Sequence, residues 1–224
     1  MSRTKIEKEF HFPVETVGGV AFDGSAVWFS DPQNQAIVRV DRGSGRVRRR
    51  LRGPKVGSGT TWDGEHLWQI GDGRIQCIEP KTGKVVRSFP VPTDGFASGL
   101  AWDGEAIWCG AYEERRLYKL DPRTGKVLRT VQSDRFVTGI TWVGDELWHA
   151  VYPEGKKGTE LRRVDAKSGE VVERVEVPCT ISGMAWDGEA FWCGDCDRAQ
   201  LRAIKVKAPS RKPARRRATA SARR

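Results

Sequence analysis

One pattern recurs five times along this chain and constrains its fold more than any other feature. Each copy opens on glycine, runs through a short apolar stretch to an aromatic residue, usually continues with Asp-Gly, and then reaches an apolar residue followed by tryptophan. Successive copies are 40, 40, 40 and 44 residues apart. Their leading glycines are Gly19, Gly59, Gly99, Gly139 and Gly183. All nine tryptophans fall in this pattern, with Phe22 in the tenth aromatic place, so the chain is an array of one small structural unit.

Each repeat predicts four short strands. Asp-Gly is a strong signal for a two-residue hairpin of type I′, in which both central residues take positive φ. A variable loop and a third strand follow, and then an acid-x-x-Thr/Ser-Gly turn, such as Asp121 to Gly125, in which the acid caps backbone amides and glycine takes a left-handed conformation. Residues 85–89 exemplify the fourth strand. Four strands in about 40 residues predict a β-propeller blade, whereas a helical solenoid of similar period would lack the hairpin signals.

The last repeat is incomplete, and the start of the chain supplies the missing part. It has no Thr-Gly turn and no fourth strand, but residues 6–13 align with the fourth strand of the second repeat, residues 85–92. We therefore expect an all-β, five-bladed β-propeller in residues 1–206, in which residues 5–12 complete blade five and close the ring. The tryptophans are expected to fill the wedges between blades.

The net charge of +10 belongs to the end of the chain. Residues 205–224 contain nine Lys and Arg and no Asp or Glu, which leaves +1 for residues 1–204. The tail, residues 207–224, has no aromatic residue, and we expect it to be disordered. Such a tail binds nucleic acid or acidic surfaces without reading sequence, or it is only a solubilising extension. Its candidate contacts are Arg211, Lys212, Arg215, Arg216, Arg217, Arg223 and Arg224.

Composition argues against a membrane or secreted protein. No stretch approaches the ~20 apolar residues of a spanning helix, and the first nine residues contain acids and no apolar run, so we expect no secretory signal. Five cysteines, an odd number, suit a reducing compartment. We expect a cytoplasmic monomer that contacts no membrane and uses no cofactor or metal.

Binding is expected on one face of the ring. The loops between second and third strands and between blades differ from repeat to repeat, whereas the hairpin turns on the opposite face are uniform. Gly18 and four hydroxyl residues directly precede the leading glycines, and such hydroxyls bind a ligand or cap the strand entry. With the polar residues of the variable loops, the candidate site residues are Ser58, Ser98, Thr138, Ser182, Asp31, Tyr112, Glu113, His149, Tyr152 and Asp195.

Two sulfur-containing patterns are weaker signals. The residues that follow the second aromatic position are Phe29, Gln69, Cys109, His149 and Cys193. These donor types are typical of metal ligands, but they belong to different blades and are expected to lie too far apart to share an ion. The stretch from Trp192 to Cys196 imitates the thioredoxin motif Trp-Cys-Gly-x-Cys, whose reactivity needs a helix N-terminus, whereas a strand is predicted here.

The repeats resemble bacterial propellers of the NHL/YVTN type, best seen from Gly99 to Val127. The stretch Gly139-Ile140-Thr141, Gly144-Asp145 and Leu147 is similar to one in five-bladed glutamine cyclotransferases. In that family and in gluconolactonase-type propellers, the residue before the leading glycine is often a functional Gln, Glu or Asn. Here that residue is glycine or a hydroxyl, which does no acid–base work without a partner base. Virginiamycin B lyase is a seven-bladed relative whose catalytic residues have no counterpart motif here.

Three functions follow as hypotheses. We expect a scaffold that binds a small polar ligand or a protein partner on the variable face. An enzyme of the glutamine cyclotransferase or lyase kind is the alternative, with Asp31, Tyr112, Glu113, His149, Tyr152 and Asp195 as its candidates. The third is a nucleic-acid-associated protein tethered by its tail. Convergent acids at the channel mouth would favour the enzyme, and a mouth of hydroxyls and aromatics would favour binding.

Overall fold

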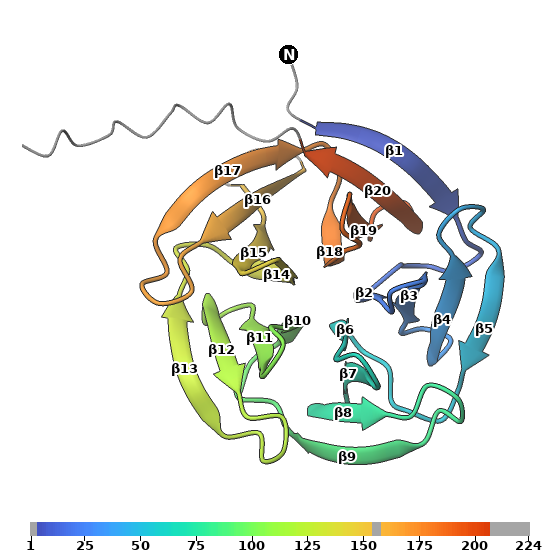
Figure 1. The fold of residues 1–224 in the computed structure, drawn as a ribbon, viewed down its shortest axis with the longest axis horizontal. Coiled ribbons are helices and arrows are strands. Elements are labelled where there is room, and N and C mark those ends of the chain that lie inside the picture. The colour runs from blue at the N-terminus through green and yellow to red at the C-terminus, as the bar shows by residue number, and fades with distance from the viewer. Residues whose placement is uncertain (1–3, 154–157, 207–224) are drawn as a thin grey trace, which may run out of the picture.

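The computed structural model describes residues 4–153 and 158–206. They form five four-stranded antiparallel sheets arranged as blades around a central axis (Figure 1), which confirms the predicted five-bladed propeller. Every element in these residues is a strand. Over the same part of the chain, no helix has the length and apolar character that crossing a bilayer requires.

Within each blade the strands are placed from a first strand beside the axis to a fourth strand at the periphery (Figure 1). Blade 1 contains β2 (Val20–Phe22), β3 (Ala26–Asp31), β4 (Ala36–Asp41) and β5 (Val47–Leu51). Blade 2 contains β6 (Thr60–Trp62), β7 (Leu67–Gly71), β8 (Arg74–Ile78) and β9 (Val85–Pro90). Blade 3 contains β10 (Ala97–Trp102), β11 (Ile107–Ala111), β12 (Arg116–Leu120) and β13 (Val127–Gln132). Blade 4 contains β14 (Val137–Val143), β15 (Glu146–Val151), β16 (Thr159–Val164) and β17 (Val171–Val177). Blade 5 contains β18 (Ile181–Trp186), β19 (Phe191–Asp195), β20 (Gln200–Val206) and β1 (Thr4–His11).

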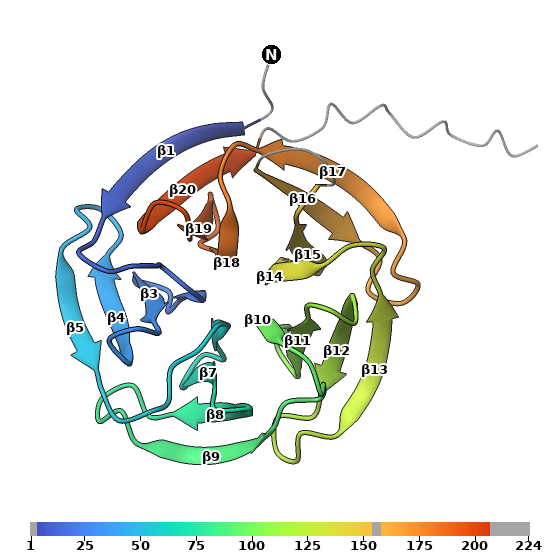
Figure 2. The same ribbon diagram turned by 180° about the vertical axis from the view of Figure 1, so that it is seen from behind.

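The ring closes through the amino-terminal strand, as predicted. β1 pairs antiparallel with β20 along its whole length, and the two strands lie side by side in both views of the ring (Figure 1, Figure 2). Phe10 of β1 stacks on Trp192 of blade 5, with 6.0 Å between ring centroids. It also touches blade 1, where a Cβ on Gly45 would lie 2.5 Å from the Phe10 ring. One strand thus completes the last blade and joins it to the first.

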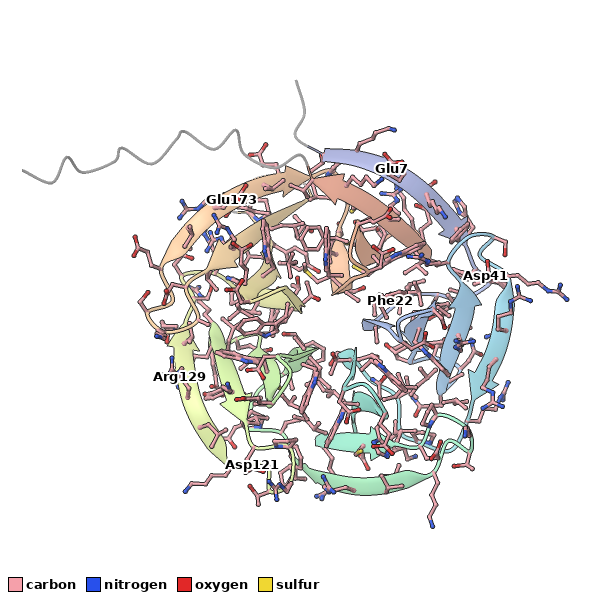
Figure 3. The ribbon with its side chains drawn as sticks, viewed as in Figure 1. Glu7, Phe22, Asp41, Asp121, Arg129 and Glu173 are labelled. Atoms are coloured by element: carbon pink, nitrogen blue, oxygen red, sulfur yellow. The ribbon has the colours of Figure 1, made fainter. Side chains whose placement is uncertain are left out.

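The hydrophobic core is divided into five parts. Buried side chains form five clusters, and each cluster combines two adjacent blades. The second tryptophans of the repeats are at most 6% exposed, as expected for wedge-filling residues, and they are Trp28, Trp68, Trp108, Trp148 and Trp192. The first aromatic residues are partly buried and surround the axis at the end where the Asp-Gly hairpins lie; they are Phe22, Trp62, Trp102, Trp142 and Trp186. Figure 3 labels Phe22 beside the axis.

The hairpin aspartate holds the second tryptophan of its own blade. Asp23 Oδ1 accepts hydrogen bonds from the backbone N–H groups of Ser25 and Ala26. Its Oδ2 accepts one from Trp28 Nε1 at 2.8 Å. Equivalent indole–carboxylate bonds of 2.7–2.8 Å join Asp63 to Trp68, Asp103 to Trp108 and Asp187 to Trp192.

The prediction of a type I′ turn for this hairpin is wrong. Only the glycine takes positive φ, as Gly24 does at 88°, and none of the four hairpin aspartates does. The loop spans four residues because the aspartate carboxylate, not a backbone carbonyl, accepts the N–H of the fourth. In blade 4, Val143 takes the place of the aspartate, and Trp148 Nε1 is buried with no hydrogen-bond partner among the described residues.

The turns between third and fourth strands follow the prediction. The carboxylates of Asp41 and Asp121 accept hydrogen bonds from backbone N–H groups of their own turns. Gly45 and Gly125 have φ of 71° and 74°, in the left-handed region that glycine tolerates best. Figure 3 shows both aspartates at the periphery of the ring.

The interface between blades 3 and 4 is incompletely filled. Elsewhere a large residue of the fourth strand packs on the turn glycine of the next blade; a Cβ on Gly125 would lie 2.5 Å from the Phe89 ring. The equivalent residue in blade 3 is the smaller Val131, opposite Gly169. A cavity of about 310 Å³ lies beside Val131. It is lined by Leu117, Val131, Gln132, Ser133, Asp134, His149, Val164, Gly169 and Val171.

We expect Phe10→Ala to lower the free energy of unfolding by about 2–3 kcal/mol, because it removes a partly buried ring that joins blade 5 to blade 1. Deleting residues 1–12 should lower the melting temperature further, because it exposes the edge of β20. Calorimetry measures both effects. Ile6→Ala, at a β1 residue that is 39% exposed, is the matched control and should change little. A truncated chain with the full melting temperature would contradict closure by β1.

We expect the propeller to lose stability as the pH falls from about 4 to about 2. Burial raises the pKa of Asp23, but the Arg39 guanidinium at 2.7 Å and the backbone and indole hydrogen bonds outweigh it and hold the pKa at about 2, below the ordinary 3.8. A carboxylate whose pKa is lowered on folding stabilises the native state above its unfolded-state pKa and loses that contribution on protonation, here about 2 kcal/mol. Urea unfolding at several pH values measures this loss. Asp23→Asn should remove that part of the pH dependence, and an unchanged pH profile would contradict the assignment.

We expect Val131→Phe to raise the free energy of unfolding by about 1 kcal/mol, because the larger ring fills the cavity between blades 3 and 4. The reciprocal variant, Phe89→Val, should create a similar cavity between blades 2 and 3 and destabilise the protein by about 2–3 kcal/mol. Denaturant titrations of both variants give the two signs. Destabilisation by Val131→Phe would mean that the cavity does not admit the ring in the orientation of Phe89.

Candidate functional site

A pocket lies at the end of the axis where the variable loops meet. Its volume is about 130 Å³, slightly below the about 150 Å³ of a cavity that holds benzene, which suits one small side chain. We call it the mouth pocket, and its lining residues are Gly18, Gly19, Ser58, Phe96, Ser98, Tyr112, Thr138, Tyr152 and Ser182. Six of the candidate residues from the sequence therefore come together in one place, from blades that are far apart in the chain.

The serine hydroxyls of the mouth pocket join neighbouring blades, whereas Thr138 Oγ1 donates a hydrogen bond to the Ala150 carbonyl of its own blade at 3.3 Å. Ser58 Oγ donates a hydrogen bond to the Ala97 carbonyl, and Ser98 Oγ donates one to the Val137 carbonyl at 2.7 Å. Ser182 donates in the same way across the closure between blades 5 and 1. These hydroxyl protons are thus already engaged, while the oxygen lone pairs remain as acceptors. The ring of hydroxyls favours a ligand that donates N–H or O–H groups.

Aromatic side chains form the rim of the mouth pocket on the side of blades 3 and 4. Tyr112 stacks on Phe136 with 4.8 Å between centroids and lies edge-on to Phe96 at 6.3 Å and to Tyr152 at 6.4 Å. The Arg115 guanidinium lies over the Phe136 ring at 4.7 Å. Phe96 is 55% exposed and Phe136 is 37% exposed. Exposed aromatic side chains grouped around a pocket are typical of a binding surface.

One candidate carboxylate lies at this rim. Glu113 Oε2 accepts a hydrogen bond from the Phe96 N–H at 2.8 Å, so the carboxylate is held next to two lining residues, Phe96 and Tyr112. Its neighbour Glu114 points elsewhere, into hydrogen bonds with Thr93 and Tyr118 that lower its pKa. Burial raises the pKa of Tyr152 well above its usual range, so this phenol stays protonated and is a hydrogen-bonding group rather than a base.

The remaining candidates, Asp31, Asp195 and His149, lie outside the mouth pocket. Asp31 is fully buried and accepts hydrogen bonds from the backbone and side-chain amides of Asn34. Asp195 is buried against Arg202 at 2.9 Å, and burial raises its pKa. His149 lines the cavity between blades 3 and 4, where burial, and secondarily the charge of Arg162, lowers its pKa to about 3. These three side chains therefore contact their own loops or blade interfaces and not the mouth pocket.

The thiols are unsuited to redox chemistry. Burial raises the pKa of Cys193 and of Cys196, whereas a reactive thiol needs a lowered one. Trp192 to Asp195 belong to strand β19, as predicted. No cluster of metal-type donors in the described ranges includes Cys109, His149 or Cys193.

The sequence contains a signal for the aromatic rim outside the positions that all five repeats share. The loop before blade 3 reads Thr-Asp-Gly-Phe-Ala-Ser, and the loop before blade 4 reads Ser-Asp-Arg-Phe-Val-Thr. Both place a phenylalanine, Phe96 or Phe136, two residues before the pocket hydroxyl. The expected basic tail, residues 207–224, and part of the fourth variable loop, residues 154–157, lie outside the described residues.

Comparison with known proteins shows the family of the chain. A sequence profile of the family described as glutamine cyclotransferase matches residues 72–195, more than half of the chain. The chain belongs to the glutamine cyclotransferase family. No curated protein sequence matches it.

The structure of glutaminyl cyclase from Myxococcus xanthus is similar to this propeller, with a TM-score of 0.76 and 13% identity over 91% of this chain and 96% of that one. Hydrazine synthase from Kuenenia stuttgartiensis matches with a TM-score of 0.51 and 15% identity over 83% of this chain and 57% of that one. At these identities both matches describe fold alone.

Proposed function

We propose that this protein is a cyclotransferase-like enzyme that binds an amine- and amide-bearing substrate, such as a peptide with amino-terminal glutamine, in the mouth pocket. The observation that carries the proposal is the composition of the pocket. A ring of hydroxyl oxygens offers acceptors to N–H groups, and the aromatic rim offers apolar surface to the rest of the substrate. Family membership supports this enzyme more than it supports a passive scaffold.

The reaction needs one proton-transferring group. In cyclisation the α-amine attacks the carboxamide carbon, a C–N bond forms within the ring, and the bond to the departing ammonia breaks. The amine loses a proton and the leaving nitrogen gains one, so the overall proton balance closes. Glu113 is the candidate for this transfer, because it is the carboxylate that the Phe96 N–H holds at the rim. The positions before the leading glycines, where the family often holds Gln, Glu or Asn, contain one glycine and four hydroxyl residues here. This chain would therefore use a different position for the same task.

A binding protein without turnover is the second candidate function. It is favoured by a specific observation: among the residues that the structure describes, those that line the mouth pocket include hydroxyls and aromatics and no carboxylate or imidazole. On this hypothesis Glu113 only orders the loop before blade 3, and the pocket retains substrate-like ligands without converting them.

We expect Glu113→Gln to lower turnover of a glutaminyl peptide by about a hundredfold or more, which is the usual contribution of general acid–base catalysis, with little change in peptide affinity. Ammonia release and mass spectrometry of the cyclised product measure turnover, and calorimetry measures binding. Glu105→Gln, at an exposed residue of the opposite face, is the matched control. Peptide binding without turnover by the unmodified protein would contradict the enzyme and support the binding protein, and absence of both would contradict the pocket assignment.

A further inference from the structure

Blade 2 departs from its sister blades at the Asp-Gly hairpin. In blade 1, Arg39 lies opposite Trp28 on the neighbouring strand and pairs with the hairpin aspartate Asp23 at 2.7 Å. In blade 3, Lys119 takes the same position and pairs with Asp103 at 2.8 Å. In blades 1 and 3 the hairpin aspartate is thus neutralised by a cation from the third strand. In blade 5, Ala203 takes that position and Asp187 pairs instead with Arg42 of blade 1 at 3.2 Å.

Cysteine replaces this cation in blade 2. Cys77 lies opposite Trp68 in the register that Arg39 and Lys119 occupy elsewhere. Within residues 4–153 and 158–206, the structure shows no lysine or arginine ion pair to Asp63. A second replacement accompanies the first: His66 stands where the sister hairpins have alanine, at Ala26, Ala106 and Ala190.

The two replacements converge on the same carboxylate. One donor atom each from Asp63, His66 and Cys77 lies within 4.8 Å of the others, and His66 Nδ1 is 3.8 Å from Asp63 Oδ2. A tetrahedral zinc ion, with bonds of about 2.0–2.3 Å to oxygen, nitrogen and sulfur, holds its ligands about 3.3–3.7 Å apart. The donor atoms need to approach one another by at most about 1.5 Å to reach that geometry.

We propose that Asp63, His66 and Cys77 form a zinc site, in which the metal ion replaces the arginine or lysine that neutralises the hairpin aspartate in blades 1 and 3. A thiolate, an imidazole and a carboxylate are together a donor set that suits Zn²⁺ rather than Ca²⁺ or Mg²⁺. Three protein donors leave a fourth position for water or for exposed Glu65, whose Oε2 lies 3.9 Å from His66 Nδ1.

The surroundings of the cluster suit an ion that enters from solvent. The Cys77 residue is 3% exposed, whereas the side chains of Asp63 and His66 are 14% and 25% exposed. Burial, assisted by the Asp63 charge, raises the pKa of Cys77 to about 11, against an opposing effect of Arg87. The metal-free site therefore holds a thiol. Binding forms the Zn–S bond, breaks the S–H bond and releases that proton to solvent. The Arg87 guanidinium donates a hydrogen bond to the Pro122 carbonyl at 3.2 Å.

The test is metal titration of the full chain, without an affinity tag and after chelator treatment. We expect one Zn²⁺ per chain by competition with a chromophoric chelator, a rise in melting temperature with Zn²⁺, and a cobalt–thiolate charge-transfer band with Co²⁺. Cys77→Ser should remove the band and weaken Zn²⁺ binding by at least about tenfold, because loss of a direct ligand exceeds the 10–100-fold effect of losing a supporting residue.

Two variants from the sister blades keep the test independent of folding failure. His66→Ala installs the alanine of blades 1, 3 and 5, and Cys77→Arg installs the arginine of blade 1, so both should fold, as circular dichroism and melting would show, and neither should bind Zn²⁺ tightly. Cys196→Ser, at the more exposed thiol of blade 5, is the control and should leave the band intact. No stoichiometric Zn²⁺ in the unmodified chain, or a cobalt band that survives Cys77→Ser or disappears in Cys196→Ser, would overturn the proposal.

Discussion

The close approach of the five inner strands is the constraint on which the rest of the propeller depends. Each leading glycine lies against the backbone or inner strand of the next blade: a Cβ on Gly19 would lie 2.2 Å from the Ser58 carbonyl oxygen, and one on Gly183 would lie 2.6 Å from Gly19 Cα. No side chain larger than hydrogen fits there without moving a strand. The glycines therefore form a waist on the axis. Residues just before the waist line the mouth pocket, and residues just after it lead to the aromatic ring at the other end.

Side chains rather than backbone geometry determine the hairpin on the far side of the waist. Asp23 accepts two backbone hydrogen bonds and one from an indole, and it also pairs with Arg39. One carboxylate thus shapes the loop, orients the wedge tryptophan and carries a charge that needs compensation. In the part of the chain that the structure describes, blade 4 lacks the carboxylate and its indole N–H has no hydrogen-bond partner, whereas blade 2 keeps the carboxylate and has no lysine or arginine paired with it. These are two different departures from one electrostatic arrangement.

The fold was predictable because the 40- to 44-residue period of the repeats gives the number of strands in each blade and the number of blades. The incomplete last repeat shows how the ring closes. The site was predictable only where register decides position: the hydroxyls before the glycines meet at the axis because the repeat places them all at the same height. Asp31 and His149 were misplaced because their position in a loop or strand does not reveal which way a side chain points when both faces of a blade are buried. Asp63 and Cys77 were missed because they are 14 residues apart in the sequence, and only the pairing of β7 with β8 brings them together. The repeat pattern describes the residues that the blades share, and Cys77 is not one of them.

In a repeat protein, therefore, the residues common to all repeats account for the fold, and the residues that occur in only one or two repeats indicate the candidate sites. Phe96 and Phe136 occur in only two of the five blade-to-blade loops, and their blades form the aromatic side of the mouth pocket. His66 and Cys77 occur in only one blade, and they converge on the aspartate that lacks its usual ion pair. A single replacement of Lys or Arg by Cys would leave a partly buried carboxylate without compensation, which is costly. The accompanying change of Ala to His at the same hairpin places an imidazole nitrogen 3.8 Å from that carboxylate, which is the second donor that the proposed zinc site requires.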